Sequence, residues 1–227
     1  MTTDLSMTET DRARIAAAVS AAESSTSGEI VTILAASSDD YADVALAWAA
    51  LAGLAALVAL ALFPDFYLGL YDRVTGAWAQ EWPPGKLFGV AALVVALKFA
   101  GTWLLLQWRP LRRTLTPAPI AHRRVHARAL AAFRIGAERR TTGRTGVLIY
   151  LSMAEHRAEI IADETIASRV TADVWGAALS AMLVEIKAGR MADGLVAAIG
   201  QVGLVLAEHF PREADDRNEL PDRLIEV

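Results

Sequence analysis

The sequence contains no cysteine among its 227 residues. A disulfide framework and a thiolate metal site are therefore excluded, and cysteine usage says nothing about the redox compartment. The acidic opening, MTTDLSMTETD, has no basic region followed by an apolar run, so we expect no cleaved signal peptide. The chain also lacks a Ser-His-Asp spacing, a G-x-x-x-x-G-K-[ST] phosphate loop and a G-x-S-x-G motif. The catalytic classes that depend on these motifs have no support.

Charge is missing from Val44 to Phe63, a run of twenty residues that also has no proline. A second run of twenty, Leu87 to Leu106, is interrupted only by Lys98. A helix of about twenty apolar residues crosses the ~30 Å hydrocarbon core of a bilayer. We therefore predict a transmembrane hairpin over residues 44–106, with the lipid bilayer as its partner. Lys98 either snorkels toward the cytoplasmic side or belongs to an ion path or an inter-subunit pair.

Basic residues are concentrated on one side of this hairpin. Residues 107–144 carry ten arginines and the single acid Glu138, whereas the connection from Pro64 to Lys86 has only Arg73 and Lys86 as basic residues. Arginine and lysine accumulate on the cytoplasmic side of membrane spans. This asymmetry predicts an integral membrane protein with two spans and both termini in the cytoplasm. Apolar residues at helical spacing from Phe66 to Trp78 predict an amphipathic helix on the outer surface, in contact with lipid or serving as a binding site.

Outside the hairpin, the hydrophobic pattern predicts alternating helices and strands. Thr8 and Asp11 have the spacing of a capping box, and Gly189 and Pro211 are typical of helix ends. The expected helices are residues 9–24, 121–140, 171–188 and 191–209, and the expected strands are residues 29–36, 145–152 and 157–162. A helix between the first two strands makes them parallel, and a short turn makes the last two a hairpin.

These elements predict an α/β fold: a small mixed sheet with helices packed on it, interrupted by the transmembrane hairpin. Residues 1–43 supply the first helix and strand, and residues 107–211 supply the remainder of the domain. Residues 212–227 are polar and are expected to form a frayed tail.

The carboxyl half resembles the TPM domain family. RTGVLIYLSMAEHRAEIIADETI is similar to the strand, polar turn and returning strand of that family, and IKAGRMADGLVAAI is similar to the entry into its last helix. TSGEIVTILA resembles the first strand of the family. The arrangement is similar to the bacterial membrane-protein branch, in which two apolar spans follow that strand. The resemblance implies a compact α/β sandwich, divalent-cation binding in some members and a phosphatase activity claimed for some.

The chain departs from the family in two turns. Where many members have a glycine-rich turn after the third strand, this chain has Ala162, Asp163 and Glu164. The turn before that strand is Ala154, Glu155 and His156 instead of a pair of aspartates.

Two acidic clusters are candidate metal sites. At the carboxyl ends of the parallel strands, Asp39, Asp40 and Glu155 offer the oxygen ligands that Ca²⁺ or Mg²⁺ prefers, beside Ser37, Ser38 and a candidate acid or base, His156. At the opposite edge, Glu29, Asp163 and Glu164 are expected near the start of the helix after Thr171. The alternative is that the first cluster is only a solvated turn. For the second cluster, the alternative is that the helix dipole alone favours carboxylates at this position.

The predicted helix 121–140 has an apolar stripe and an arginine-rich face. His122 and His126 have the i, i+4 spacing of metal ligands, but no acid lies between them and Arg123, Arg124 and Arg128 surround them. A solvated basic face, which binds anionic lipid headgroups beside a membrane, is therefore favoured.

Two main classes of function follow from these patterns, and a third possibility is a membrane-surface scaffold whose arginine-rich helix binds anionic lipid. The first is a membrane-anchored TPM-like accessory module on the cytoplasmic face that binds a protein partner or a divalent cation. The alternative is a metal-dependent phosphatase that uses one of the acidic clusters. No nucleic-acid partner is expected.

Overall fold

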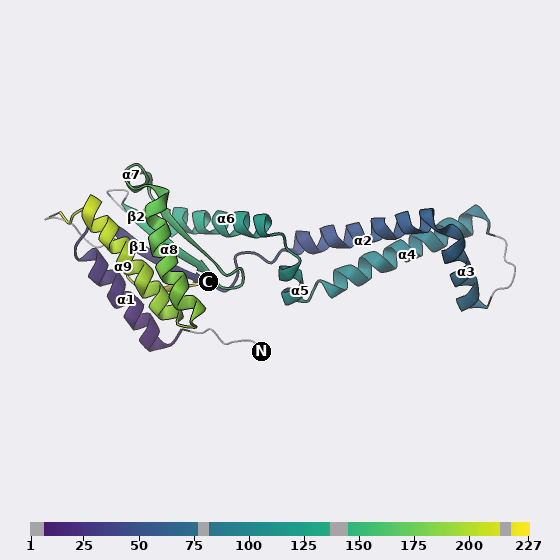
Figure 1. Ribbon diagram of the computed structural model, residues 1–227, viewed down its shortest axis with the longest axis horizontal. Helices are drawn as coiled ribbons and strands as arrows, with labels where there is room; N and C mark the ends of the chain where they lie inside the picture. The colour runs from purple at the N-terminus through teal and green to yellow at the C-terminus, as the bar shows by residue number, and fades with distance from the viewer. Residues whose placement is uncertain (1–6, 77–81, 137–144, 214–218) are drawn as a thin grey trace. The chain divides into compact units, whose positions relative to one another are not determined.

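The computed structural model describes residues 7–76, 82–136, 145–213 and 219–227 (Figure 1). The chain divides into two compact units. One is an α/β domain built from residues up to Asp39 and from Pro119 onward, and the other is a helical unit from Asp40 to Ala118. The unit borders therefore fall a few residues outside the predicted hairpin 44–106 on its amino side, and twelve residues outside it on its carboxyl side.

The α/β domain contains a four-stranded mixed sheet in the order β3-β2-β1-β4. Its strands are β1 (Glu29–Ala35), β2 (Gly146–Ser152), β3 (Arg157–Ala162) and β4 (Ile225–Glu226). β1 is parallel to β2 and β4, and β2 is antiparallel to β3. The predicted mixed sheet, the parallel pairing of the first two strands and the hairpin of the last two are confirmed.

The two faces of the sheet bury different side chains. Ile30, Val147 and Ile149 face one core, which also contains residues of α1 (Glu9–Glu23), α8 (Ala172–Lys187) and α9 (Met191–His209). Val31, Leu148 and Tyr150 face a smaller core against α6 (Ala118–Gly136). A short helix, α7 (Glu164–Ala167), follows β3. Because β1 and β2 are buried on both faces, they are continuous apolar runs, as in other parallel sheets.

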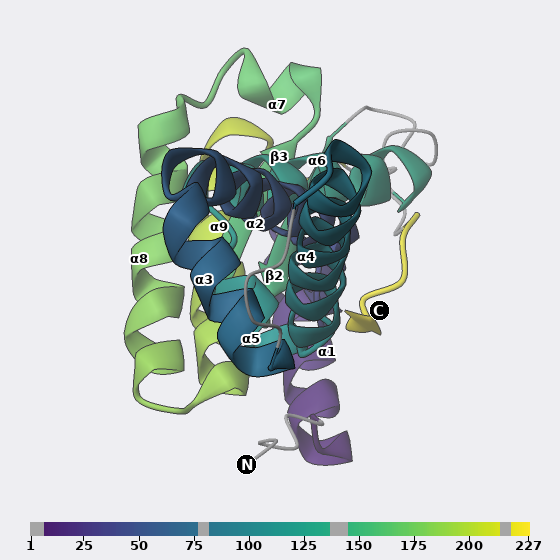
Figure 2. The same cartoon turned by 90° about the vertical axis from the view of Figure 1, so that its right-hand side faces the viewer.

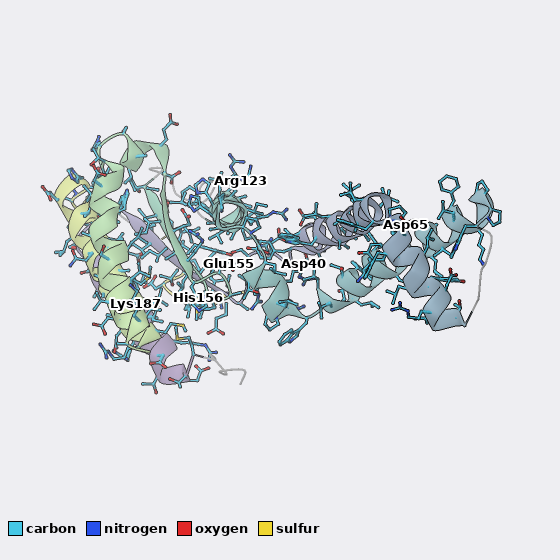
Figure 3. The ribbon with its side chains drawn as sticks, turned by 45° about the vertical axis from the view of Figure 1, so that its right-hand side comes forward. Asp40, Asp65, Arg123, Glu155, His156 and Lys187 are labelled. Carbon is cyan, nitrogen blue, oxygen red and sulfur yellow. The ribbon has the colours of Figure 1, made fainter. Side chains whose placement is uncertain are left out.

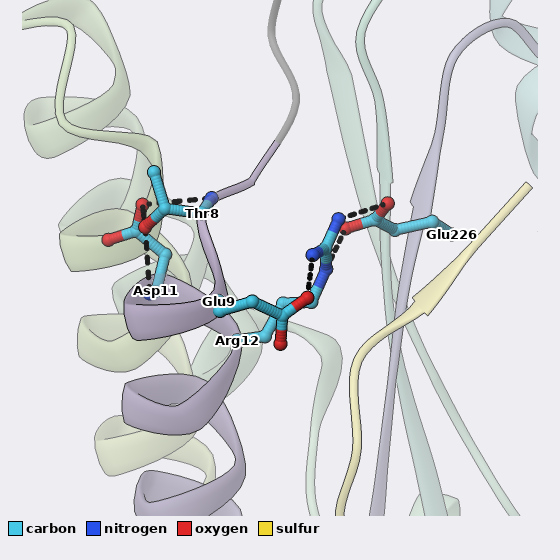
Figure 4. A network of polar contacts seen from close by, with 5 residues as sticks. All are labelled: Thr8, Glu9, Asp11, Arg12 and Glu226. Atoms are coloured by element: carbon cyan, nitrogen blue, oxygen red, sulfur yellow. Dashed lines mark hydrogen bonds and ion pairs between the residues drawn. The ribbon is translucent and has the colours of Figure 1, made fainter.

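The carboxyl end of the chain corrects the prediction of a polar tail over residues 212–227. β4 pairs with β1, and Leu220 and Leu224 are buried, with 3% and 8% of their surface exposed. The sequence did not indicate a strand here because the apolar residues of this segment are few and stand among charged ones. Glu226 also accepts a hydrogen bond from Nε of Arg12 at 2.9 Å, and Arg12 contacts Glu9 at 2.6 Å (Figure 4). The ion pair between Arg12 and Glu226 connects β4 to α1.

The first helix begins at the predicted capping box. The hydroxyl of Thr8 accepts from the amide of Asp11 at 3.1 Å, and the carboxylate of Asp11 accepts from the Thr8 hydroxyl at 2.7 Å (Figure 4). The hydrogen bond from Thr8 lowers the pKa of the Asp11 carboxyl below its usual value. The stabilisation from this contact is therefore present above the ordinary pKa and is lost as the pH falls through the lowered one.

The segment that carried the family resemblance, IKAGRMADGLVAAI, forms the junction of α8 and α9. Gly189 adopts a φ of +80°, which ends α8 in the left-handed conformation that glycine tolerates. A Cβ on Gly194 would lie 2.8 Å from the carbonyl oxygen of Met182, so α9 packs directly on the backbone of α8. Leu195 is fully buried. Thr171 precedes α8 as its N-cap residue, but its side chain makes no capping hydrogen bond.

The helical unit contains two long antiparallel apolar helices that pack side by side (Figures 1 and 2). These are α2 (Ala42–Leu62) and α4 (Pro84–Leu105), with α3 (Pro64–Thr75) between them in sequence and α5 (Arg109–Thr114) after them. At their contact, Gly53 lies opposite Val95. α3 matches the amino-terminal part of the predicted amphipathic helix, and Trp78 lies outside the described residues.

Three described helices are long and apolar enough to cross a membrane: α2, α4 and α9. They differ in how much protein covers them. α9 packs between α1 and α8, and its stripe of Leu195, Ile199, Val202 and Leu206 is fully buried. α4 buries no residue, and its Phe88, Leu97 and Leu104 are 62–71% exposed. Packing within the domain therefore accounts for the apolar character of α9, but not for that of α2 and α4.

Candidate functional site

The candidate site lies where β1 and β2 end together. The register pairs Ala35 with Ser152, so the residues after β1 meet the turn between β2 and β3. Backbone hydrogen bonds from Met153 to Ala35 (2.9 Å) and from Ala154 to Ala36 (3.1 Å) hold the two segments together. This is the carboxyl edge of parallel strands, where open α/β sheets tend to bind ligands.

Glu155 is the centre of the site. One of its carboxylate oxygens accepts from the hydroxyl of Ser37 at 3.0 Å, and the other accepts from the amide of Ser38 at 3.2 Å and from the hydroxyl of Ser152. The prediction that Ser37 and Ser38 face Glu155 is confirmed. Because several donors already use this carboxylate, a metal ion would have to displace them to bind it.

A chain of hydroxyl groups extends from the carboxylate into the core. The Ser38 hydroxyl contacts the Ser152 hydroxyl at 2.8 Å and the Tyr150 hydroxyl at 3.0 Å. Ser152 and Tyr150 have none of their surface exposed. A serine without solvent access cannot attack a substrate, so Ser152 is a structural residue in this arrangement.

The other members of the first acidic cluster are engaged separately. Asp39 forms an ion pair with Arg124 of α6 at 2.5 Å. Asp40 belongs to the helical unit, where its carboxylate accepts from the amide of Ala42 at 3.0 Å at the start of α2. His156 is exposed, has a φ of 50°, and lies beside Glu155 in the β2–β3 turn (Figure 3). Its ring makes no hydrogen bond within the described residues.

In the second predicted cluster, two of the three carboxylates bind backbone amides. Glu29 accepts from the amides of Glu219 (3.2 Å) and Leu220 (3.1 Å), which fixes the segment that leads to β4. Asp163 accepts from the amide of Gly146 at 3.0 Å, at the start of β2. Glu29 and Asp163 are 5% and 4% exposed, whereas Glu164 is exposed on α7. Neither predicted cluster, as far as its residues are described, gathers three side chains around a position for an ion.

Sequence reasoning missed three contributors to these contacts: Ser152, Tyr150 and Arg124. The parallel pairing of β1 and β2 already implied that Ser152 would lie beside the residues after β1. Tyr150 could have been added because alternate residues of a strand share a face. Arg124 gave no such signal, since its distance from Asp39 depends on how α6 crosses the sheet.

The fold defines the class of the protein: an α/β domain with a mixed sheet whose central crossover is interrupted by an apolar helical hairpin. The model of the TPM domain family matches residues 121–205, which run from α6 into α9. The NMR structure of the BA42 protein from the psychrophilic bacterium Bizionia argentinensis is similar, with a TM-score of 0.56, 20% sequence identity and coverage of 100% of both chains. At this identity the similarity concerns the fold alone. No curated protein matches the chain.

Proposed function

We propose that this protein is a membrane-anchored TPM-like accessory module that acts by binding. The main support for the anchor is that α2 and α4 expose their large apolar side chains. In α9, which is also long and apolar enough to span a membrane, the stripe from Leu195 to Leu206 is instead buried in the domain, although Leu204 is exposed. Leaving so many Leu, Phe and Val side chains in water would be costly, at about 25 cal/mol per Å² of apolar surface. A lipid bilayer removes this cost. The proposed anchor is therefore a hairpin of two spans.

The orientation follows from the basic residues beside the hairpin. α5 follows directly after α4 and contains Arg109, Arg112 and Arg113, whereas α3, between the spans, contains only Arg73. By the positive-inside rule, α5 is cytoplasmic and α3 is outside. Both termini, and with them the α/β domain, are then cytoplasmic.

Labelling of single cysteines tests this topology, and the cysteine-free sequence makes it direct because no native thiol has to be removed. With a membrane-impermeant thiol reagent on intact cells, Thr75→Cys is expected to react and Arg212→Cys to react only after the cells are opened. Reaction of Arg212→Cys in intact cells would refute the cytoplasmic assignment. Release of the unmodified protein from membranes by alkaline carbonate would refute the anchor itself.

Binding is favoured over catalysis because the described carboxylates of the candidate site already have protein partners. Glu155 accepts from serine donors and Asp39 pairs with Arg124. A protein partner is consistent with the exposed Leu183 and Val184 of α8. The competing class is a metal-dependent phosphatase. Turnover of a generic phosphate ester that requires Mg²⁺, Mn²⁺ or Ca²⁺ and is lost in Asp39→Asn would favour that class instead.

We also propose that α6 contacts anionic lipid headgroups. Arg123, Arg128 and Arg134 are exposed on it, and Arg139, Arg140 and Arg144 of the predicted basic segment lie outside the described residues. Each basic residue near an anionic surface contributes about 1 kcal/mol. In reconstituted vesicles, protection of α6 from proteolysis is expected to require anionic lipid and to weaken with salt, and it should be reduced by Arg123→Gln with Arg128→Gln.

A further inference from the structure

Two histidines and a glutamate form a cluster that the candidate site does not use. His122 and His126 lie one turn apart on α6, and Glu159 lies on β3. The Nδ1 atom of His122 is 3.5 Å from one carboxylate oxygen of Glu159, and Nδ1 of His126 is 3.3 Å from the other. The Glu159 side chain is only 17% exposed, whereas the two imidazole side chains are 57% and 54% exposed. A carboxylate held on a strand is thus approached by two exposed imidazoles from the helix that packs on it.

This contact changes the interpretation of the histidine pair. The sequence argued against a cation because no acid lies between the histidines, but β3 supplies that acid from 33 residues further along the chain. The surrounding arginines also repel a cation at this position less than their places in the sequence indicate. At about 100° per residue, Arg124 and Arg128 point roughly 180° and 140° away from the direction midway between the two histidines. Arg124 is moreover paired with Asp39.

Two further cations lie on this side of the domain. Arg123 is adjacent to His122 and projects from α6 as an exposed side chain (Figure 3). Arg157 lies two residues before Glu159 on β3, so it shares the sheet face that carries Glu159. Both have long side chains that can extend into solvent away from the cluster.

We propose that His122, His126 and Glu159 form a binding site for a transition-metal dication of the zinc class. Histidines at i and i+4 on one helical face are a recurrent zinc-binding arrangement, and a carboxylate is a common third ligand. With metal–ligand distances of about 2.0–2.1 Å, two ligands of a tetrahedral site lie about 3.3–3.5 Å apart. Each of the two nitrogen–oxygen distances lies in this range, one to each oxygen of the Glu159 carboxylate. The fourth position is left to water, because the imidazoles are half exposed.

Binding requires only side-chain movement. In the described part of the chain, no three such side chains are placed to hold an ion as they stand. Each imidazole here contacts the carboxylate directly. Rotation of the two exposed imidazoles would replace these contacts by two metal–nitrogen bonds, while the backbones of α6 and β3 stay in place. The ion would then join the helix to the edge strand of the sheet. This site is independent of the acidic clusters and of the proposed membrane anchor.

The test is zinc binding by the full-length, tag-free chain in detergent. Isothermal titration with Zn²⁺ is expected to give one site per chain, and Zn²⁺ at micromolar concentration should raise the midpoint of thermal unfolding, because it binds only the folded site. Mg²⁺ and Ca²⁺, which prefer oxygen ligands, should not produce this shift. His122→Gln, His126→Gln and Glu159→Gln should each weaken zinc binding by at least about tenfold, the lower limit seen when even an indirect ligand partner is removed.

The chain provides its own controls, because it has four histidines and two lie outside the cluster. His156→Gln and His209→Gln should bind zinc as the unmodified protein does. The absence of a zinc site in the unmodified protein would overturn the proposal, and so would a site that survives the double replacement of His122 and His126. Loss of the site in His156→Gln or His209→Gln would assign the zinc to other ligands and overturn it as well. If Glu159→Gln does not fold, the two single histidine variants decide.

Discussion

Glu155 fastens the end of β1 to the turn after β2 through donors from three other residues. Ser37 and Ser38 come from one segment and Ser152 from the other. The carboxylate thus crosslinks positions more than a hundred residues apart, next to the point where the chain leaves the α/β domain for the helical unit. The structure therefore supports a stabilising role for Glu155: it holds the end of β1 in place where the chain leaves the α/β domain.

Replacing Glu155 by glutamine is expected to lower the free energy of unfolding by about 2 kcal/mol. Hydrogen bonds to a charged group contribute about 1.5–3 kcal/mol, and the neutral amide presents an NH₂ group where a donor now approaches. The measurement is chemical unfolding of the detergent-solubilised protein. Glu208→Gln is the matched control, since Glu208 is exposed and makes no hydrogen bond to a described residue, and it should change stability by less than about 0.5 kcal/mol. Equal stabilities of the two variants would contradict the structural role of Glu155.

The sequence could predict which residues gather at this edge, but not how their charges are used. Strand order and polarity place Ser37, Ser38 and Glu155 together, because the parallel strands end at the same edge. Whether a carboxylate binds an ion or a backbone amide depends on distances of a few tenths of an ångström, which no local pattern encodes. For the same reason, the sequence could not predict that Glu159 lies near His122 and His126. This contact depends on how α6 crosses β3.

At the scale of the element, the α8–α9 junction explains why the family-like segment has its glycines where they are. Gly194 allows α9 to contact the backbone of α8, and Gly203 allows it to contact α1, where an added Cβ would lie 2.7 Å from Cβ of Ala22. Gly200 lies on the exposed side of the same helix with open space around it. One helix therefore contains glycines of two kinds, which a single type of substitution can distinguish.

Gly194→Ala is expected to destabilise the domain by about 1–3 kcal/mol, because overpacking forces the two helices apart. Gly200→Ala should instead stabilise it by up to about 1 kcal/mol, since alanine is the better helix former and meets no neighbour. Thermal and chemical unfolding of the two variants in the same detergent measure this difference. Stabilisation by both substitutions would show that α8 and α9 do not pack as closely as described.

Helices and strands with a strong apolar period were predictable, and β4 was not. The predicted helices 9–24, 171–188 and 191–209 agree with α1, α8 and α9 within one or two residues at each end. β4 contains only Ile225 and Glu226, and it is held by pairing with β1 and by the ion pair from Arg12. A strand of two residues carries too little periodicity to be read from sequence, because distant partners supply its stability.

At the scale of the whole molecule, the α/β domain consists of two segments separated by the helical unit. The helical unit lies between β1 and α6, the position at which the insertion is predicted. The segments are interdependent, because β1 is central in the sheet and comes from the first, whereas its neighbours β2 and β4 come from the second. The ion pair between Asp39 and Arg124 brings the two sites of chain exit and return near each other.

A flexible linker of about ten Gly and Ser residues in place of residues 41–117 is expected to give a folded domain that needs no detergent. Such a linker has a root-mean-square span of roughly 17 Å, enough to join Asp40 to Ala118 if Asp39 and Arg124 stay paired. Circular dichroism and a cooperative thermal transition would show folding. Residues 118–227 alone should remain unfolded, because they lack the central strand. A folded fragment 118–227 would contradict the interdependence of the two segments.

The position of β1 also determines the order in which the protein can be assembled during synthesis. Its first partner, Gly146, follows Glu29 by 117 residues, so at 5–20 residues per second β1 waits roughly 6 to 23 s on the ribosome before β2 is made. By the end of that interval the helical unit, residues 40–118, has been made, while β1 is still an apolar strand with two open edges. Early capture of the hairpin at a membrane would keep these nascent strands apart on separate ribosomes, and β4, the last strand in chain order, can pair with β1 only after β2 and β3 have been made.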